Sequence, residues 1–365
     1  MTAAGIAILG STGSIGTTAL AVLARQRDRF RVIALTTNGA VEVLGRQVGE
    51  VGALYHGAVS RDGPDCLVTA ATHPEVDVVI NAVVGAAGLE ATLAALRVGK
   101  RVALANKESL VMAGDLVRRT AAEGGGEVVP IDSEHSAVLQ CITGHPASLA
   151  RLILTASGGP FREWPAARVR DATVAEALQH PTWRMGRKIT VDSATLANKA
   201  LEVIEAHHLF GLPYEAIEVV VHPQSIVHGF VEFVDGSILA QIGYPSMELP
   251  ILYALTHPDR VPDPGTRRFD PVGAGPLTFE PVRQEAFPTF ALGVGAGRRG
   301  GTAPAVFNAA NEVAVGAFLT GRIPFGRIPE LIASALRGHD PLPADTLAAV
   351  VDADRWARAY TQGAL

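Results

Sequence analysis

Short apolar runs alternate with helical patterns over the first third of the chain. Runs rich in Val and Ile, as is typical of strands, occupy residues 5–10, 30–37, 76–84, 101–106 and 125–132. Between several of them lie Ala- and Leu-rich stretches with helical spacing, as at 17–26 and 89–99. This alternation predicts a parallel sheet with helices on both of its faces.

The pattern changes after residue 131. Residues 225–244 read as a hairpin that turns at Asp235-Gly236, so antiparallel strands are expected there. Pro and Gly then become dense, and the last stretches, at 308–319, 328–336 and 350–360, are helical. We therefore predict an α/β protein. Its expected parts are a Rossmann-like domain (1–131), a central α+β domain with a mixed sheet (132–256), a linker (257–285) and a C-terminal helical domain (286–365).

Composition excludes several classes of protein. The chain has 365 residues, of which 48% are hydrophobic, so it can bury more than one core. A net charge of −5 disfavours a nucleic-acid binder, which should present a basic face. Cys66 and Cys141 have no metal-like spacing, and the N-terminal run is too short to span a membrane and lacks a basic secretion signal. We expect a cytoplasmic protein with no nucleic-acid or membrane partner.

A glycine-rich turn follows the first predicted strand. Gly10, Gly13 and Gly16 have the spacing G-x-x-G-x-x-G, a variant of the dinucleotide-binding fingerprint. Such a turn lets a pyrophosphate approach the backbone at a helix N-terminus, where Ser11, Thr12 and Ser14 can add hydrogen bonds. The alternative is a glycine-rich turn that binds nothing.

The tip of the second predicted strand should report which dinucleotide binds. An NAD enzyme commonly has an acid there, whereas this chain has Thr36, Thr37, Asn38 and Gly39. The missing carboxylate favours NADP, but no Lys or Arg is present at the tip to bind a 2′-phosphate. These residues leave the preference open.

Two acids end the last predicted strand of the sheet. Asp132 and Glu134 are two residues apart, so in an extended strand they would face the same way at the carboxyl edge. Adjacent carboxylates repel unless a cation lies between them, and hard oxygen ligands suit Mg²⁺ or Mn²⁺. The alternative is an Asp-Ser helix cap with an acid in the first turn.

A third acid lies on a later helix. Residues 191–211 are predicted to begin with an Asp192-Ser193 cap and continue as one helix, on which Asn198, Lys199 and Glu202 share a face. A solvated Lys-Glu pair is the ordinary interpretation of that pattern. The apolar residues around it favour a stripe that lines a pocket.

Further stretches suit the binding of a phosphate and its enclosure. Ser157, Gly158 and Gly159 follow a strand, so backbone N–H groups and a hydroxyl can cradle an anion, with Ser193 and Lys199 adding to the site. Asn106, Lys107 and Glu108 follow another strand at a carboxyl end. Residues 180–190 combine His180, Trp183 and Met185 with cations, as a closing loop would, although an ordinary surface loop is the alternative. His135, His222 and His228 are more often structural residues than proton carriers.

Seven motifs carry a resemblance to one family. They are LGSTGSIG, ALANKESLV, PIDSEHSA, SGGPFR, HPTWRMGRKITVDSATLANKALEVIEA, HPQSIVHG and NAANEVAVGAFL. In this order they resemble the 1-deoxy-D-xylulose 5-phosphate reductoisomerases over essentially the whole chain. The resemblance implies a homodimeric enzyme that uses NADPH and a divalent cation (Mg²⁺, Mn²⁺ or Co²⁺) and makes 2-C-methyl-D-erythritol 4-phosphate for non-mevalonate isoprenoid synthesis.

The resemblance also implies roles for individual residues. The implied metal ligands are Asp132, Glu134 and Glu202. The implied phosphate ligands are Ser157, Ser193, Asn198 and Lys199. The other implied substrate or catalytic residues are Lys107, Ser133, His180, Trp183 and Met247. The dinucleotide is expected at Gly10, Ser11, Thr12, Gly13, Ser14 and Ile15, at Asn38, Gly39 and Ala40, at Asn106, Lys107 and Glu108, and at Gly186.

One segment departs from the family pattern. The family usually has Gly-Lys/Arg-Asn at the tip of the second strand, where this chain has Asn38-Gly39-Ala40. The missing cation concerns the binding of the 2′-phosphate and leaves the family resemblance intact. Two other functions remain possible from the residues alone, a catalytically silent dinucleotide sensor and a simple NADP dehydrogenase of the homoserine dehydrogenase type.

Overall fold

The computed structural model describes residues 3–365, and contacts between Cα atoms divide them into two compact units. The first unit holds the described residues up to Ser109, together with Val117–Gly144 and Ser246–Phe269. The second holds Leu110–Leu116, His145–Pro245 and Asp270–Leu365. The chain thus leaves the first unit and returns to it later. The four-part division drawn from the sequence stays a prediction.

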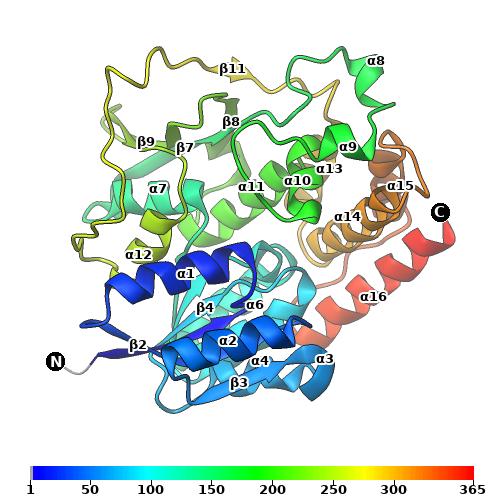
Figure 1. The fold of residues 1–365 in the computed structure, drawn as a ribbon. Helices are drawn as coiled ribbons and strands as arrows, with labels where there is room; N and C mark the ends of the chain where they lie inside the picture. The colour runs from blue at the N-terminus through cyan, green and yellow to red at the C-terminus, as the bar shows by residue number, and fades with distance from the viewer. Residues whose placement is uncertain (1–2) are drawn as a thin grey trace. The chain divides into compact units, whose positions relative to one another are not determined.

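A six-stranded parallel sheet forms the centre of the first unit (Figure 1). Its strands are β1 (Ala4–Leu9), β2 (Phe30–Thr37), β3 (Tyr55–Ala58), β4 (Val78–Asn81), β5 (Arg101–Leu104) and β6 (Glu127–Pro130). Their order, β3-β2-β1-β4-β5-β6, is that of a Rossmann-like fold and confirms the predicted class. The sequence pattern had not shown β3, because its four residues, Tyr-His-Gly-Ala, form no Val- or Ile-rich run.

Helices cover this sheet and complete its core. They are α1 (Ser14–Arg25), α2 (Val41–Val51), α3 (Val59–Asp62), α4 (Asp65–Ala71), α5 (Leu89–Arg97), α7 (Ser133–Ile142) and α12 (Glu248–Thr256), with a 3-10 turn at Ala86–Gly88. The two ends of α6 (Lys107–Gly124) also belong to this unit, whereas its middle, Leu110–Leu116, belongs to the second unit. Buried residues of α1 and α12, such as Val22 and Ile251, pack with Ile6, Ile8 and Ile80 of the strands. The core therefore joins residues more than 200 positions apart in the sequence.

An ion-pair cluster fixes the returning segment to the first unit. Arg25, at the end of α1, donates from Nε and Nη2 to the two oxygens of Asp263, each at 2.8 Å. The same Nη2 also donates to Glu248 Oε2 at 2.9 Å. The Asp263 side chain is only 1% exposed, so this forked pair holds residues 248–263 at one place on α1.

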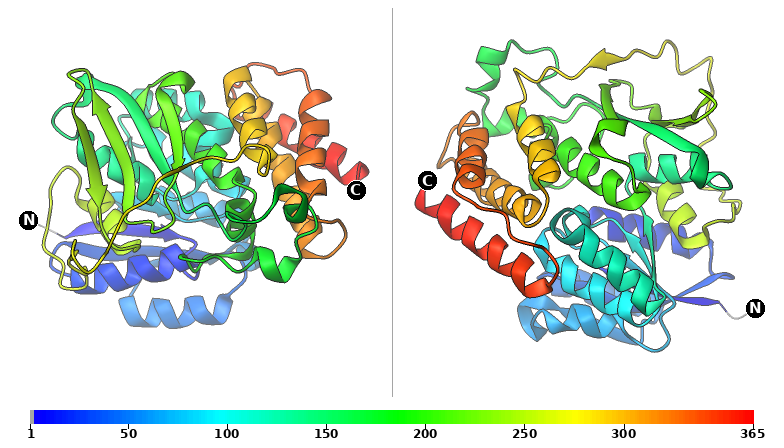
Figure 2. Two further views of the ribbon diagram at one scale, coloured as in Figure 1. Left: turned by 90° about the horizontal axis from the view of Figure 1, so that it is seen from above. Right: turned by 180° about the vertical axis from the view of Figure 1, so that it is seen from behind.

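A mixed sheet lies in the second unit (Figure 2). Its strands are β7 (Leu149–Ala156), β8 (Ile217–Val221), β9 (Val227–Phe233), β10 (Ile238–Ile242) and β11 (Glu280–Pro281), in the order β10-β9-β7-β8-β11. β7 and β8 are parallel and the other pairs antiparallel. The predicted hairpin is confirmed, because β9 and β10 are joined through Asp235 and Gly236, and Gly236 has a φ of 83°.

Helices make up the rest of the second unit. They are α8 (Ala166–Val169), α9 (Val174–Ala177), α10 (Arg187–Ala194), α11 (Ala197–Phe210), α13 (Pro288–Arg299), α14 (Ala303–Leu319), α15 (Arg327–Arg337) and α16 (Leu347–Gly363), with 3-10 turns at Pro146–Ser148 and Tyr214–Ala216. Most residues of α14 are buried, and it packs against α13, α15 and α16. The predicted C-terminal helical part is thereby confirmed. No helix among residues 3–365 is long and apolar enough to cross a membrane.

Candidate active site

The glycine turn after β1 packs closely against the start of α1. Gly10 has a φ of 84°, which favours glycine. A Cβ atom on Gly16 would lie 2.4 Å from the carbonyl oxygen of Gly10, so only a glycine lets α1 pack this closely on the turn. Gly13 is the N-cap of α1, which begins at Ser14, and because glycine has no side chain, no side chain caps the first N–H groups of the helix there. The turn thus presents a cradle that larger residues would fill.

The tip of β2 is neutral. Thr36 and Thr37 are buried at its end, whereas residues 38–40 are exposed. The N–H of Ser60, in α3, donates to the carbonyl of Asn38 at 2.8 Å, so α3 lies alongside the tip. Arg61 in α3 is bonded to Asp62, and this contact lowers the pKa of the Asp62 carboxyl to about 2.

The start of α6 is held firmly at the carboxyl edge of the sheet. Asn106 is the N-cap, and its side-chain oxygen accepts from the N–H of Ser109 at 3.0 Å. The Asn106 amide donates to the carbonyls of Val83 at 2.7 Å and Gly85 at 2.9 Å. Lys107 and Glu108 follow it, and each is only 6% exposed. The loop after β4 and the start of α6 are therefore locked together beside β1.

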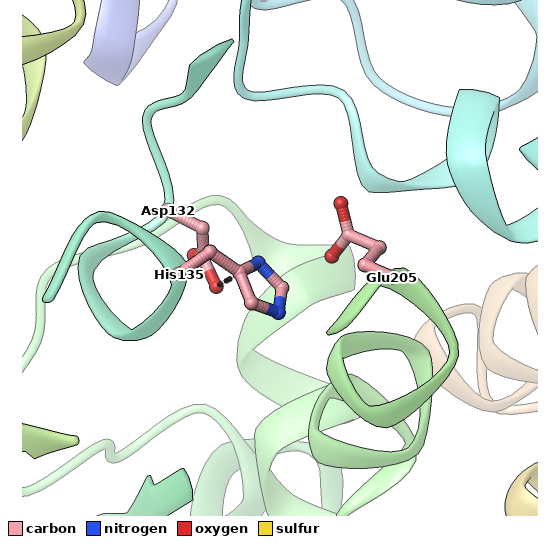
Figure 3. A group of neighbouring side chains, drawn as sticks. All are labelled: Asp132, His135 and Glu205. Atoms are coloured by element: carbon pink, nitrogen blue, oxygen red, sulfur yellow. Dashed lines mark ion pairs between the residues drawn. The ribbon is translucent and has the colours of Figure 1, made fainter. Parts of the chain in front are cut away.

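Asp132 occupies a cap position without acting as a cap. It is the N-cap of α7, yet its side chain accepts no hydrogen bond from that helix. Its Oδ2 instead lies 2.6 Å from Lys107 Nζ. The same oxygen lies 3.6 Å from Nδ1 of the buried His135, an ion pair that Figure 3 draws. Ser133 donates to Glu134 at 2.5 Å. The helix-cap alternative therefore describes the backbone of Asp132 and leaves its carboxylate to other partners.

The strand argument for Asp132 and Glu134 was wrong in its geometry. β6 ends at Pro130, and Glu134 lies in the first turn of α7, so the two acids do not alternate along a strand. α7 begins at Ser133, soon after β6 ends, and the side chain of its N-cap residue Asp132 makes no capping hydrogen bond. The acids stay near one another through the helix start and not through the period of a strand.

The polar stripe on α11 is buried. Lys199 is 3% exposed and Glu202 is 1% exposed, which excludes a solvated surface pair. Asn198 and Lys199 both donate to the Glu202 carboxylate, and Lys199 also donates to the carbonyl of Thr155 at 2.5 Å, at the end of β7. Glu205 follows one turn later and is 3% exposed. Glu205 is the third residue drawn in Figure 3. The sequence analysis did not name it, although a spacing of three residues from Glu202 indicates that both glutamates lie on the same face of α11.

The candidate phosphate residues of the second unit converge. The loop after β7 carries Ser157, then Gly158 and Gly159 with φ values of 83° and 66°. A Cβ atom on Gly159 would lie 2.9 Å from the carbonyl oxygen of Ser193, so this loop lies directly against the end of α10. Lys199 reaches Thr155, two residues before Ser157. Hydroxyl, amide and ammonium groups thus gather around the carboxyl end of β7.

The helix expected over residues 191–211 is two helices. α10 ends at Ala194 and α11 begins at Ala197, with Leu196 between them in the left-handed region at a φ of 56°. Asp192 and Ser193 therefore belong to the last turn of α10, and the predicted Asp-Ser cap of α11 was wrong. No Gly or Pro marks the break, so the sequence pattern gave no warning of it.

His180 organises the candidate closing loop. Its Nδ1 accepts hydrogen bonds from the N–H groups of Thr182 at 3.1 Å and Trp183 at 2.8 Å. The proton is consequently on Nε2, which donates to Ser157 Oγ at 3.0 Å. Burial lowers the pKa of His180 to about 4, so the ring is neutral at pH 7. Trp183 faces His228, with their ring centroids 6.5 Å apart.

The remaining predicted residues occupy defined positions. Gly186 is the exposed N-cap of α10, and Met247 is the N-cap of α12 and packs on the core of the first unit. His222 uses both ring nitrogens for the backbone, one toward the Thr278 carbonyl and one accepting from the Ile226 N–H. His222 is therefore structural.

Asp132 and Glu134 belong to the first unit and Glu202 to the second, so their joint role as metal ligands remains a matter for proposal.

Family models match most of the chain. The model described as 1-deoxy-D-xylulose 5-phosphate reductoisomerase matches residues 6–62 and 58–114. The model for the C-terminal domain of the same enzyme matches residues 128–210, and the DXP reductoisomerase C-terminal domain matches residues 242–360.

Curated relatives and solved structures agree with these matches. The 1-deoxy-D-xylulose 5-phosphate reductoisomerase of Symbiobacterium thermophilum is 49% identical over 97% of both chains, and that of Mycobacterium marinum is 50% identical over 99% of this chain and 92% of its own. The Zymomonas mobilis enzyme in complex with NADPH has a TM-score of 0.90 at 40% identity, covering 100% of this chain and 99% of its own. A reductoisomerase in complex with NADPH, fosmidomycin and magnesium has a TM-score of 0.93 at 38% identity, covering 99% and 98%.

Proposed function

The chain belongs to the 1-deoxy-D-xylulose 5-phosphate reductoisomerase family, and we propose that it catalyses the reaction that names the family. It rearranges 1-deoxy-D-xylulose 5-phosphate and reduces the product with NADPH to 2-C-methyl-D-erythritol 4-phosphate, a step of non-mevalonate isoprenoid synthesis. The enzyme is an NADP-dependent oxidoreductase that uses NADPH and a divalent cation. The observation that carries this function is the 49% identity over 97% of both chains.

Asp132, Glu134 and Glu202 are the proposed ligands of the divalent cation. Three carboxylates form the hard oxygen set that Mg²⁺, Mn²⁺ and Co²⁺ accept. Asp132 fits this role, because its buried Oδ2 accepts no hydrogen bond and is paired only by charge, with the Lys107 ammonium. A metal ion could take the place of that ammonium beside the carboxylate. When bound, the cation would polarise substrate oxygens and fix their positions.

The substrate phosphate is assigned to Ser157, Ser193, Asn198 and Lys199. The convergence of these residues at the end of β7 supports the assignment, as does the positive φ of Gly158 and Gly159, which turns the loop that carries Ser157. A phosphate held there supplies binding energy away from the bond that reacts, and so positions the reacting carbons.

Other side chains handle the reacting part of the substrate. The rearrangement breaks one carbon–carbon bond and forms another, which places negative charge on substrate oxygens. The Lys107 ammonium, held at 2.6 Å from Asp132, can stabilise that charge, with the Ser133 hydroxyl beside Glu134. His180 contributes as a neutral imidazole that shapes the loop, and Trp183 and Met247 exclude water from the substrate.

NADPH is assigned to the turn after β1 and to the edge of the sheet beside it. The proposed contacts are Gly10, Ser11, Thr12, Gly13, Ser14, Ile15, Asn38, Gly39, Ala40, Asn106, Lys107, Glu108 and Gly186. The cradle at Gly16 and the uncapped N-terminus of α1 fit a pyrophosphate. The strand order reverses between β2-β1 and β4, which is where dinucleotides bind in sheets of this kind.

A second copy of the chain is the proposed partner of strand β10. This strand is an edge of the mixed sheet, and Ile238, Leu239 and Ile242 on it are 50%, 49% and 42% exposed. An apolar edge strand presents unpaired backbone N–H and C=O groups that can pair with a strand of another chain. The cytoplasmic location stays a prediction.

A turnover assay tests the proposed function. Purified protein with 1-deoxy-D-xylulose 5-phosphate should oxidise NADPH only when Mg²⁺ or Mn²⁺ is present, and the product should carry a rearranged carbon skeleton. The same assay with NADH in place of NADPH measures whether a protein with a neutral β2 tip still prefers NADPH. An unrearranged, reduced product would instead establish a simple dehydrogenase, and binding without turnover would establish a sensor.

The substitution Glu202→Gln tests the metal assignment. Removing one negative ligand should lower kcat by at least about 100-fold and weaken the binding of Mn²⁺, because losing even a group that only orients a metal ligand already weakens metal binding strongly. NADPH affinity should stay within about twofold. Glu218→Gln, an exposed glutamate on β8, is the matched control. Normal turnover in Glu202→Gln would remove this residue from the ligand set.

A further inference from the structure

The asparagine-rich stretch of α14 has no part in the function assigned so far. Its two asparagines, Asn308 and Asn311, are each fully buried although they lie in the helical part of the second unit. Asn311 donates from Nδ2 to Oδ1 of Asp192 at 2.7 Å. Asn308 instead donates to Glu312 at 3.1 Å, on its own helix, and to Met112 Sδ of α6 at 3.6 Å. One of the two asparagines thus links α14 to α10.

Asp192 is a charged group enclosed by protein. It is 1% exposed, and its second oxygen, Oδ2, pairs with Lys188 Nζ at 2.9 Å. A carboxylate without partners in such surroundings would be costly, so its contacts must be kept. Lys188 lies on α10 together with Asp192, one turn earlier, whereas Asn311 comes from another helix. The Asn311 amide therefore fixes where α10 lies on α14.

The end of α10 is rigidly connected to the groups assigned to the phosphate. Ser193 directly follows Asp192. The Thr195 hydroxyl donates to the Asp192 carbonyl at 3.2 Å and accepts from the Ala197 N–H at 3.2 Å, and this holds Leu196 in its left-handed conformation. The first turn of α11 then presents Asn198 and Lys199.

We propose that Asn311 and Asp192 are positioning residues that hold Ser193 and the start of α11 in the geometry that binds the substrate phosphate. Neither residue touches the phosphate. The Asn311 amide sets the place of Asp192, and Asp192 sets the place of the turn that follows it. This inference rests on the proposed assignment of the phosphate to Ser193, Asn198 and Lys199.

The substitution Asn311→Ala tests the proposal with a readout specific to the phosphate. Losing a hydrogen bond to a buried charge should raise KM for 1-deoxy-D-xylulose 5-phosphate on the order of tenfold, with kcat changed less than about threefold. The kcat/KM for 1-deoxy-D-xylulose, which lacks the phosphate, should not change, nor should NADPH affinity. Asn308→Ala is the matched control, because it removes an equally buried amide on the same helix that does not contact Asp192.

A second set of variants covers the case in which Asn311→Ala does not fold. Asn311→Ser keeps a polar group but is too short to keep the same contact, and should shift KM in the same direction. The double substitution Asp192→Asn with Asn311→Asp exchanges donor and acceptor. It should reverse part of the increase in KM that Asp192→Asn alone produces. Equal loss of activity toward both substrates, or equal effects of Asn311→Ala and Asn308→Ala, would show a merely structural role and overturn the proposal.

Ser193→Ala separates this inference from the assignment beneath it. If Ser193→Ala leaves KM for the phosphorylated substrate unchanged, the phosphate assignment fails, and the positioning inference fails with it. If Ser193→Ala raises KM and Asn311→Ala does not, the phosphate site stands and only the positioning role is wrong.

Discussion

A helix N-cap aspartate normally accepts a hydrogen bond from its own helix, and Asp132 does not. Its carboxylate is committed to Lys107, and through that contact to the start of α6. The start of α7 thus gives up a side-chain cap, whereas the start of α6 keeps the one that Asn106 provides. Such local cost is common where side chains are reserved for a ligand.

His180 is expected to titrate far below the usual range of histidine. Because burial lowers its pKa to about 4, the native protein binds this proton less readily than the unfolded chain, whose value is near 6.5. The contribution of the neutral ring to stability is therefore complete above about pH 6.5 and is lost as the pH falls toward 4.

Imidazole ¹⁵N NMR of the native protein checks this expectation. The His180 resonances should stay those of a neutral ring with the proton on Nε2 from pH 8 down to pH 5. Assignment would come from their disappearance in His180→Gln. A midpoint above pH 6 would contradict the buried environment described for this ring.

The neutral tip of β2 should respond to an added cation. Gly39 is exposed, and a Cβ atom there would lie 3.7 Å from Ser60 Oγ, an ordinary contact, so a lysine can be accommodated. We expect Gly39→Lys to tighten NADPH binding by about threefold to tenfold relative to NADH, with the gain falling as salt is raised. Fluorescence titration of both nucleotides measures this, and Gly39→Gln is the neutral control. Equal effects on NADPH and NADH would place the 2′-phosphate elsewhere.

At the scale of elements, the turn before α1 requires glycine at position 16 because the turn and the helix lie so close together. In Gly16→Ala the new Cβ would lie 2.4 Å from the Gly10 carbonyl oxygen, so backbone must move. NADPH affinity should fall by at least about tenfold, while binding of 1-deoxy-D-xylulose 5-phosphate to the protein with Mn²⁺ alone should change little. In Gly13→Ala the nearest atom is 3.4 Å away, and the loss should be smaller. Calorimetric titration of both ligands distinguishes the two variants, and equal losses would refute the close-approach argument.

Sequence periodicity predicted the elements that bury one continuous face, and it failed where the deciding contact is distant. The Val- and Ile-rich strands and the long C-terminal helices were found, because burial imposes a repeating pattern on them. β3 was missed because it is short, and the break at Leu196 was missed because a left-handed leucine leaves no local signature. Asp192 was taken for a cap, since only the fold brings Asn311 to it. The residues of the candidate site were found through motif resemblance more than through pattern.

At the scale of the whole molecule, the edge strand β10 is expected to decide the oligomeric state. Leu239→Glu would place a charge on an exposed apolar strand that we propose is covered by a second copy. Sedimentation velocity should show a dimer for the original protein and a shift toward monomer for this variant. Leu54→Glu, which adds the same charge at an exposed leucine of the first unit, should leave the dimer intact. A dimer in both variants would mean that another surface joins the two copies.

The return of residues 246–269 to the first unit sets a limit on the order in which the protein can fold as it is synthesised. Helix α12 contributes Ile251, Leu252 and Leu255 to the core of a sheet whose last strand ends at Pro130. Burying such side chains is worth about 1.5–3 kcal/mol each, and the Arg25–Asp263 pair forms only after the same segment has emerged. The first unit therefore cannot reach its final stability until 269 of the 365 residues have left the ribosome. A nascent chain that carries all six strands of that sheet still exposes an apolar face, and this face is covered only after α12 has been synthesised.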